Sequence, residues 1–400
     1  MSTAVTSVYE WNDLDWRAID RQVFKLQTRI YRAARRGEGT TVHRLQRFLM
    51  ASWAARCLAV RRVSQDNRGK RTAGVDGVKR LTPPQRLQLA ERLTLLATAR
   101  PARRVWIPKP GTTEKRPLAI PTMDDRARQA LALLALEPEW EAVFEPHSYG
   151  FRPGRGAHDA IEAIFTAICR KPKFVLDADI AKCFERIDRE ALLTKLQTFP
   201  RLRRAINAWV TAGVLDGGEL FPTTAGTPQG GLASPLLANI ALHGFATAIA
   251  TAFPPTKVVN GRRVNPWRPI VVRYADDLVI LHEDAGVITE THRLAATWLA
   301  DMGLELKPSK TQITHTLRPY DGRVGFDFLG FPIQQYPVGR THSGKDGLGR
   351  PLGFKTIITP STAAQRRHQQ VIRARVRRER TVSQADLVAE LTPLIRGWTR

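Results

Sequence analysis

The spacing of apolar residues along the chain predicts a mixture of helices and strands. Near the N-terminus, apolar side chains recur every three or four positions, which is the period of an amphipathic helix. One such series runs from Ile19 to Ile30, and a second begins at Val42. The Gly-Glu-Gly segment at 37–39 breaks the pattern between them, so we expect two helices over 17–60.

Further along, short apolar runs bounded by turn residues predict strands. A basic two-stranded hairpin is expected over 103–121, and apolar strands are expected at 174–176, 270–272, 278–281 and 326–331. Helices are expected over 83–98, 126–141, 286–302 and the arginine-rich segment 355–400. The aromatic, Arg- and Gly-rich segment 148–156 is expected to be a loop whose rings and guanidinium groups stack bases or bind phosphate.

The stretch 220–256 contains no Asp, Glu, Lys or Arg, and its second half has the length of a membrane span. Asn239 and His243 interrupt that half, however, so we interpret it as a helix buried under a sheet.

Charge changes the picture more than any other property of the composition. The chain has 400 residues, enough for two or three domains, and its 62 Lys and Arg against 37 Asp and Glu give a net charge of +25. A polyanion is the natural partner of such a chain, and nucleic acid is the commonest polyanion. The alternative is a host whose proteins are basic in general.

The cysteines and the N-terminus restrict the compartment. Cys57, Cys169 and Cys183 lie far apart without a CxxC motif, which predicts neither a zinc site nor a disulfide framework and fits a reducing environment. Residues 1–16 carry acids and no apolar core, so no signal peptide is predicted. We therefore expect a cytoplasmic protein without a membrane partner.

The tetrapeptide Tyr274-Ala275-Asp276-Asp277 places two adjacent carboxylates at the tip of a predicted β-hairpin. Charges beside buried strands are unfavourable unless something pairs them, and a divalent cation is the expected partner. Mg²⁺ takes one or two carboxylates plus substrate phosphates, which is the arrangement of phosphoryl-transfer polymerases. Asp177 and Asp179 follow the strand at 174–176. Because residues i and i+2 share one face of a strand, spacing alone leaves open which of the two joins this site.

These segments together resemble the motif series of reverse transcriptases. The motifs are LDADI…CF from Leu176, TPQGG…SPLLANI from Thr227, YADD at 274–277, GLELKPSKT at 303–311 and FDFLGF at 326–331. Four flanking segments are similar to the bacterial group II intron-encoded reverse transcriptase/maturase family: AGVDGV at 73–78, IPKPG…KRPLAIP at 107–121, SYGFRPGRGAHDAI at 148–161 and HSGKDGLGRPLGFKTIITPS at 342–361. The resemblance covers nearly the whole chain, from about Trp11 to Arg400.

The resemblance implies an α+β fold with the right-hand architecture of a polymerase, in which a central antiparallel sheet forms the palm. The domains it implies are a helical N-terminal extension over 1–80, fingers and palm over 81–335, a basic Gly-rich loop over 336–354 and the start of a helical thumb or maturase region over 355–400. The family continues past this point, so we expect a C-terminally truncated form without the family's HNH endonuclease.

The resemblance also implies roles for individual residues. It selects Asp179 over Asp177 and gives three catalytic carboxylates, Asp179, Asp276 and Asp277. The implied cofactor is a pair of Mg²⁺ ions, replaceable by Mn²⁺, with ligands at Asp179, Ile180, Asp276 and Asp277. The implied nucleotide contacts are Lys109, Arg116, Phe184, Gln229 and Lys310, and the implied primer grip is Phe328, Leu329 and Gly330. Phe184 matches the ring that lies beneath the incoming sugar and excludes a 2′-hydroxyl.

The implied function is RNA-directed DNA polymerisation by two-metal nucleotidyl transfer. The implied partners are an RNA template, intron RNA, a DNA primer or target and dNTPs. The implied location is a cytoplasmic ribonucleoprotein that carries out splicing and retrohoming. The resemblance also allows a dimer. Two alternatives stay open: an RNA-binding maturase with little polymerase activity, and a reverse transcriptase of a defence or retron-like system.

Overall fold

The computed structural model describes residues 10–108, 113–223, 225–227, 229–259, 261–264 and 267–399. The chain forms two compact units. Unit 1 comprises Met1–Pro146, Ala181–Phe245 and Thr297–Glu305, and unit 2 comprises His147–Ile180, Ala246–Ala296 and Leu306–Arg400.

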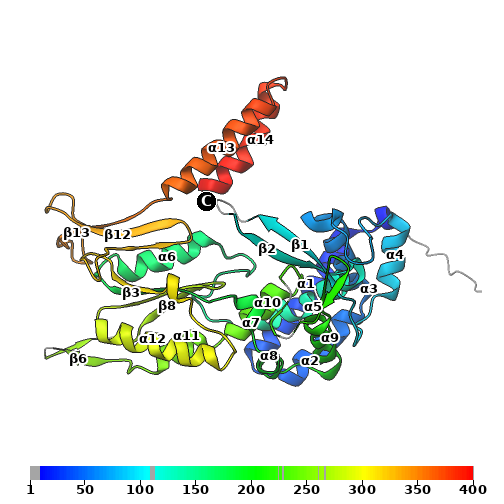
Figure 1. Ribbon diagram of the computed structural model, residues 1–400, viewed down its shortest axis with the longest axis horizontal. Helices are drawn as coiled ribbons and strands as arrows, with labels where there is room; N and C mark the ends of the chain where they lie inside the picture. Colours follow the sequence, from blue (N-terminus) through cyan, green and yellow to red (C-terminus); the bar gives the residue numbers. More distant parts are fainter. Residues whose placement is uncertain are drawn as a thin grey trace, which may run out of the picture. The chain divides into compact units, whose positions relative to one another are not determined.

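Unit 1 is mainly helical (Figure 1). Its helices are α1 (Trp16–Arg35), α2 (Gly39–Ala51), α3 (Trp53–Arg61), α4 (Pro83–Arg92), α5 (Met123–Glu141), α7 (Cys183–Arg186), α8 (Arg189–Leu196), α9 (Pro200–Thr211) and α10 (Ser234–Leu242). The apolar series beginning at Ile19 is buried where α1 packs against α2 and α5. The prediction of two helices over 17–60 is wrong in one respect. Ser52 begins a third helix, because its side-chain oxygen accepts the Ala55 N–H and caps α3.

The basic hairpin expected over 103–121 is confirmed and belongs to a larger sheet. β1 (Ala102–Pro108) pairs antiparallel with β2 (Lys115–Ile120). The sheet has the order β2-β1-β4-β5, in which β4 (Val214–Asp216) runs parallel to β1 and β5 (Glu219–Phe221) completes a second hairpin. The basic residues of β1 and β2 are therefore held on a four-stranded sheet.

The uncharged stretch forms two helices where one was expected. α10 ends at Leu242, and α11 (Phe245–Thr251) follows after Gly244, whose φ of +88° favours glycine. All residues of α10 except Pro235 are buried, and the helix packs against α5, α7 and α8. Among the described residues, no helix combines the length and the apolar character needed to cross a membrane.

A largely shielded carboxyl group makes the stability of unit 1 depend on pH. Glu139 of α5 accepts a hydrogen bond from the buried Gln46 side-chain amide, with 2.6 Å between Nε2 and Oε2. Burial raises the pKa of Glu139 to about 7, and the Gln46 hydrogen bond opposes this shift. The folded state therefore binds a proton more tightly than the unfolded state. The stabilisation of the folded state that comes from binding this proton is present at low pH. It is lost as the pH rises through about 7.

We therefore expect Glu139→Gln to stabilise the protein at pH 8 by about 2 kcal/mol, with a gain below about 1 kcal/mol at pH 5. The neutral amide avoids burying a charge and can still accept from Gln46. Thermal unfolding at both pH values tests this, with the exposed Glu91→Gln on α4 as the control for loss of one negative charge. An equal gain for both variants, or a gain independent of pH, would contradict the assignment.

Unit 2 is built on a central antiparallel sheet, as the sequence predicts. The order of this central sheet is β10-β3-β9-β8, and its strands are β3 (Phe174–Asp179), β8 (Ile270–Tyr274), β9 (Asp277–His282) and β10 (Gln312–His315). All neighbours pair antiparallel. Helix α6 (Ala157–Ile168) lies across one face (Figure 1) and buries Ile164 and Ile168 against the core residues Val175, Val272 and Val279.

The remaining elements of unit 2 include a second, three-stranded sheet. Its order is β11-β12-β13, with β11 (Phe326–Phe328), β12 (Phe331–Pro337) and β13 (Phe354–Ile358). The aromatic segment 326–331 is thus a tight hairpin and not the single strand that was expected. A small ribbon of β6 (Lys257–Val259) and β7 (Arg262–Val264) stands apart, and α11 and α12 (Ala285–Ala300) each cross a boundary between the units.

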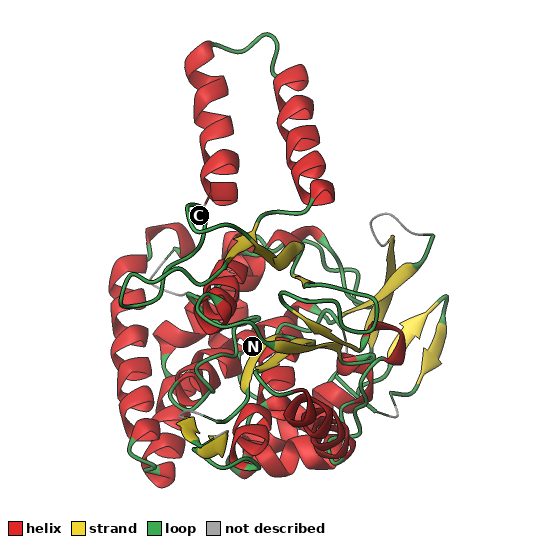
Figure 2. Cartoon of the chain, turned by 90° about the vertical axis from the view of Figure 1, so that its left-hand side faces the viewer, coloured by secondary structure: helices red, strands yellow, loops and turns green. Residues whose placement is uncertain are grey.

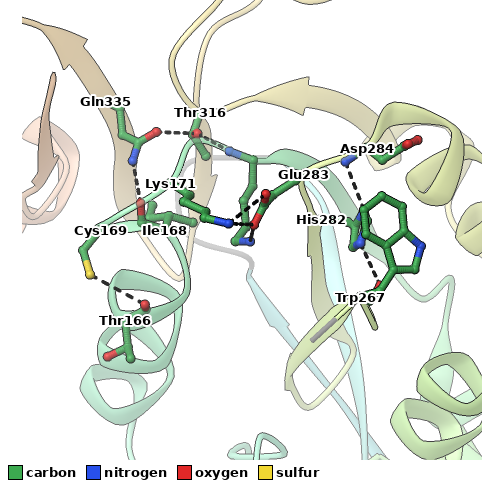
Figure 3. A network of polar contacts seen from close by, with 11 residues as sticks. Thr166, Ile168, Cys169, Lys171, Trp267, His282, Glu283, Asp284, Thr316 and Gln335 are labelled. Carbon is green, nitrogen blue, oxygen red and sulfur yellow. Dashed lines mark hydrogen bonds and ion pairs between the residues drawn. The ribbon is translucent and has the colours of Figure 1, made fainter. Parts of the chain in front are cut away.

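Buried polar side chains tie the second sheet to the central sheet (Figure 3). The Gln335 amide of β12 donates to the Ile168 carbonyl at the end of α6, at 2.7 Å. Its oxygen accepts from the Thr316 hydroxyl at 2.6 Å, and that hydroxyl oxygen accepts from the Lys173 backbone N–H at 2.9 Å. Because both Gln335 and Thr316 are fully buried, leaving either partner unpaired would be costly.

A second part of the same region fixes the far end of β9. Glu283 accepts from the ammonium groups of both Lys171 and Lys173, at 3.1 and 3.2 Å. His282 accepts the Asp284 backbone N–H through Nδ1, so its Nε2–H donates to the Trp267 carbonyl at 2.8 Å. Burial lowers the pKa of His282, which favours this neutral ring. These contacts hold the segment before β8 against the central sheet.

The C-terminal part forms two neighbouring helices, α13 (Thr362–Arg378) and α14 (Gln384–Thr399) (Figure 2). The helical prediction for this segment holds only from Thr362, because Phe354–Ile358 form β13 and pair with β12. His368 and Trp398 stack with ring centroids 4.2 Å apart. Cys57, Cys169 and Cys183 form no disulfide with one another.

Candidate active site

The predicted carboxylate hairpin lies at one end of the central sheet. Tyr274 and Asp277 are the last paired residues of β8 and β9, so Ala275 and Asp276 form a two-residue turn. Ala275 has a φ of +58°, which is unfavourable for a residue with a Cβ. Such a conformation persists only where the surroundings determine it. We call Tyr274–Asp277 the β8–β9 turn.

Residues from the loop at 148–156 provide those surroundings. The buried Arg273 guanidinium donates to the Ala275 carbonyl at 3.1 Å and to the Ser148 hydroxyl at 2.7 Å. The backbones also pair, since the Tyr149 N–H donates to the Arg273 carbonyl at 2.9 Å. A Cβ on Gly150 would lie 2.3 Å from the Ala275 nitrogen, so only glycine allows this approach. The first residues of this loop hold the β8–β9 turn, and contact of the loop with nucleic acid stays a prediction.

Three carboxylates meet beside this turn. Asp179, at the end of β3, is paired in register with Asp277 on β9, and the Ile180 N–H donates to the Asp276 carbonyl at 3.0 Å. The Asp179 carbonyl accepts from the Lys307 N–H at 2.7 Å, which fixes the strand end on its other side. Burial, and then the charges of Asp276 and Asp179, raise the pKa of Asp277 to about 6. The carboxylates are therefore close enough for their charges to repel.

Asp177 has a different environment from Asp179, although both lie on one face of β3. Its carboxylate accepts from the Gln312 amide of β10 at 2.9 Å, and burial raises its pKa. Asp179 lies opposite Asp277 at the end of the strand. The geometry thus groups Asp179, and not Asp177, with the β8–β9 turn.

Lys310 supplies a positive charge to this group of carboxylates. It lies in the short 3₁₀ turn Pro308–Lys310, and its ammonium forms an ion pair with Asp179. The hydrogen bond to Asp179 raises the pKa of Lys310, so the amine stays protonated. The Lys310 side chain is 56% exposed and that of Asp179 is 14% exposed, so the pair stands at the surface where a substrate could reach it.

The donor atoms at this end of the sheet are hard oxygens, which suit Mg²⁺. Within the described ranges, no group of three or more His, Cys, Asp or Glu side chains is arranged so that it could hold a metal ion by itself. An open arrangement is what Mg²⁺ uses in nucleotidyl transfer, because it binds one or two carboxylates and keeps positions for water and substrate phosphates. Burial, and then the charges of Asp276 and Asp179, raise the pKa of Asp277, so a cation beside these carboxylates would be favourable.

Unit 1 holds most of the other predicted nucleotide contacts. Phe184 is a half-buried residue of α7, and its carbonyl accepts from the Thr227 N–H at 2.6 Å. Gln229 accepts the Ala119 N–H through its backbone carbonyl at 2.5 Å, and its side-chain Oε1 is buried without a hydrogen-bond partner. Arg116 is exposed on β2, opposite Ile107. Lys109 lies outside the described residues.

The predicted primer grip is the turn between β11 and β12. Phe328 is buried in the core of unit 2, whereas Leu329 and Gly330 have φ of +52° and +82°. The Gly330 carbonyl accepts from the Ser361 N–H at 2.8 Å, so the segment before α13 fixes this turn.

Two family models match the chain, and several known proteins are similar to it. The family model described as "Reverse transcriptase (RNA-dependent DNA polymerase)" matches residues 107–333, and "N-terminal domain of reverse transcriptase" matches residues 11–93. Protein YkfC of Escherichia coli K12 is 31% identical over 72% of this chain and 82% of its own length. Group II intron-encoded protein LtrA of Lactococcus lactis subsp. cremoris is 40% identical over 36% of this chain and 24% of its own length.

A third relative is an uncharacterized 91 kDa protein in the cob intron of Schizosaccharomyces pombe. It is 29% identical over 54% of this chain and 32% of its own length. The chain thus spans about a quarter to a third of the two intron proteins, and about four-fifths of the E. coli protein.

Proposed function

Because the chain belongs to the reverse transcriptase (RNA-dependent DNA polymerase) family, we propose that it extends a DNA primer on an RNA template at the site formed by Asp179, Asp276 and Asp277. It is of the group II intron-encoded reverse transcriptase/maturase type, to which its intron-encoded relatives point. The observation that carries the residue assignment is the position of Asp179 opposite Asp277 beside the β8–β9 turn, where burial, and then the charges of Asp276 and Asp179, raise the pKa of Asp277.

Reverse transcriptases generally depend on divalent metal ions. We assign two Mg²⁺ ions to this chain, with Mn²⁺ able to replace them, and Asp179, Ile180, Asp276 and Asp277 as ligands. When bound, such ions lower the pKa of the primer 3′-hydroxyl and neutralise the charge that develops on the triphosphate. The protonated Lys310 beside Asp179 adds a further positive charge for the departing pyrophosphate.

The other predicted residues have positioning roles in this proposal. Lys109 and Arg116 bind the triphosphate, Gln229 lies against the template–nucleotide pair, and the turn at Phe328, Leu329 and Gly330 holds the primer. In this proposal the partners are an RNA template, intron RNA, a DNA primer or target, and dNTPs. The protein acts within a cytoplasmic ribonucleoprotein that supports splicing and retrohoming, and it can form a dimer there. The net charge of +25 supports a polyanionic partner and predicts RNA binding that weakens steeply with salt.

Primer extension on poly(rA)/oligo(dT) with dTTP and Mg²⁺ tests the proposal. We expect extension by the wild type that EDTA and Asp276→Ala abolish. Absence of extension with RNA binding retained would favour the alternative, an RNA-binding maturase with little polymerase activity. The grouped carboxylates weigh against that alternative, because a site without catalytic demand has little reason to keep acids together.

Phe184→Ala should relax the discrimination between dNTPs and rNTPs by roughly tenfold. The aromatic ring is expected to occupy the space that a 2′-hydroxyl needs, so its removal should raise rNTP incorporation while dNTP incorporation changes less. Single-nucleotide incorporation of dTTP and UTP measures the ratio. Phe184→Tyr, which keeps the ring, is the matched control. Unchanged discrimination in the alanine variant would show that another residue excludes the 2′-hydroxyl.

A further inference from the structure

Unit 1 contains a cavity that shares no residue with the predicted nucleotide contacts. Its volume is about 580 Å³, and it lies among α2, α3, α5, the segment after α4 and the start of α9. The apolar part of its lining includes Met50, Leu95 and Phe199, which are 8%, 6% and 7% exposed. The volume falls within the roughly 300–1,000 Å³ of sites that bind small organic groups.

Four arginines line this cavity, which we call the arginine pocket: Arg47, Arg56, Arg201 and Arg204. The lining includes no Asp or Glu. Within the part of the chain that the structure describes, none of the four guanidinium groups forms an ion pair with a carboxylate. Four positive charges around a partly apolar cavity repel one another, so an anion in the pocket would be favourable.

Neutral groups orient three of these four guanidinium groups without neutralising them. Arg56 donates to the Glu91 carbonyl at 2.8 Å, and its Nε is buried without a hydrogen-bond partner. Arg201 donates to the Leu95 carbonyl at 3.3 Å, and Arg47 lies 5.7 Å from the centre of the Phe199 ring. Three of the four guanidinium groups are therefore held at the pocket without a carboxylate partner, and Arg204 is exposed beside them.

The ligand should combine an apolar ring with more than one negative charge. Guanidinium groups match the geometry of phosphate oxygens, and aromatic side chains accept unstacked bases of single strands. We propose that the arginine pocket holds an unstacked nucleotide of single-stranded RNA, with its base against Phe199 and its flanking phosphates on the arginines. This inference rests on the proposed function, which makes RNA a partner of the chain. An acidic peptide would satisfy the arginines but offers no planar base for the apolar lining.

Photo-crosslinking tests this inference on the full chain. The probe is a short single-stranded RNA containing one 4-thiouridine, and crosslinked peptides are identified by mass spectrometry. We expect crosslinks in the peptides that contain Met50, Thr94 or Phe199. The double variant Arg201→Ala/Arg204→Ala should reduce their yield by roughly tenfold, because two phosphate contacts are lost.

Two further variants separate the pocket from general charge effects. Arg29→Ala/Arg32→Ala removes two exposed cations from α1 and should change the yield by less than about twofold. Thr94→Trp keeps all four arginines and fills the cavity, so it should abolish the pocket crosslinks. Thermal unfolding verifies that each variant folds.

Three results would overturn the inference: equal losses in both double variants, wild-type crosslinks only outside the pocket, or crosslinks that persist in Thr94→Trp. Competition by a glutamate-rich peptide as efficient as that by unlabelled RNA would identify an acidic peptide as the ligand instead. Primer extension run in parallel keeps the proposals separate. Extension without pocket crosslinks refutes only the pocket, and pocket crosslinks without extension refute only the polymerase.

Discussion

Asp179→Asn should lower the rate of nucleotide incorporation by roughly a thousandfold, whereas Asp177→Asn should leave it within about threefold of the wild type. Both changes remove one negative charge from β3 and preserve the shape of the side chain. They differ in what the carboxylate faces. Asp179 lies opposite Asp277 and forms an ion pair with Lys310, while Asp177 accepts a hydrogen bond from Gln312.

The reason for the difference is the charge that each position must supply. An asparagine at 179 keeps an oxygen but loses the negative charge that would attract a divalent cation and that pairs with the Lys310 ammonium. An asparagine at 177 can still accept the hydrogen bond from Gln312. The rate of incorporation should therefore change little, and the only other effect is the removal of a partly buried negative charge.

Single-turnover incorporation of one nucleotide, with RNA binding and thermal unfolding measured alongside, distinguishes the two variants. Both should bind RNA and unfold near the wild-type temperature. Comparable activity of Asp179→Asn and wild type, or a thousandfold loss for Asp177→Asn as well, would show that the carboxylates are assigned wrongly.

Gly150→Ala should reduce the rate of nucleotide incorporation by roughly a hundredfold, solely because it displaces the β8–β9 turn. The added Cβ would lie 2.3 Å from the Ala275 nitrogen, which is backbone and cannot swing aside. The turn must therefore shift, and Asp276 and Asp277 shift with it. A displacement of about 1 Å is enough for a loss of this size.

Gly156→Ala is the matched control for this prediction. It lies in the same loop, and the nearest atom to its added Cβ is the Asp159 Oδ2 at 3.7 Å, which is an ordinary contact. We expect that variant to retain nearly full activity. Equal activity of the two alanine variants, with both folded, would mean that the loop does not hold the turn.

The sequence predicts three of the four strands of the central sheet, because each of those three carries its own signal, whereas β10 was not predicted. The runs at 174–176, 270–272 and 278–281 are short, apolar and bounded by polar residues, and the structure pairs them as β3, β8 and β9. Elements without such a signal were missed. β4 and β5 are three residues each, and β13 is recognisable as a strand only through its pairing with β12.

In the site, too, the residues with a local sequence signal were predicted and those without one were missed. Adjacent carboxylates are visible in the sequence, and the choice of Asp179 over Asp177 came from family resemblance. The roles of Arg273, Ser148 and Gly150 were not predicted, because they depend on a contact between segments 125 residues apart. The need for glycine at position 150 can be recognised only when its neighbour in space, Ala275, is known. The arginine pocket was also missed, since its cations come from three separate helices.

The helices α13 and α14 should unfold locally before the rest of the protein. α13 buries no side chain, so its structure depends on the His368–Trp398 stack and on ion pairs such as Arg375–Glu390 at 3.0 Å. Few buried contacts mean a small free energy of local unfolding. These helices should therefore exchange their amide hydrogens and admit trypsin at their many arginines long before the cores of the two units open. The boundary of the protein's cooperative folding then lies near Ser361, well inside the chain.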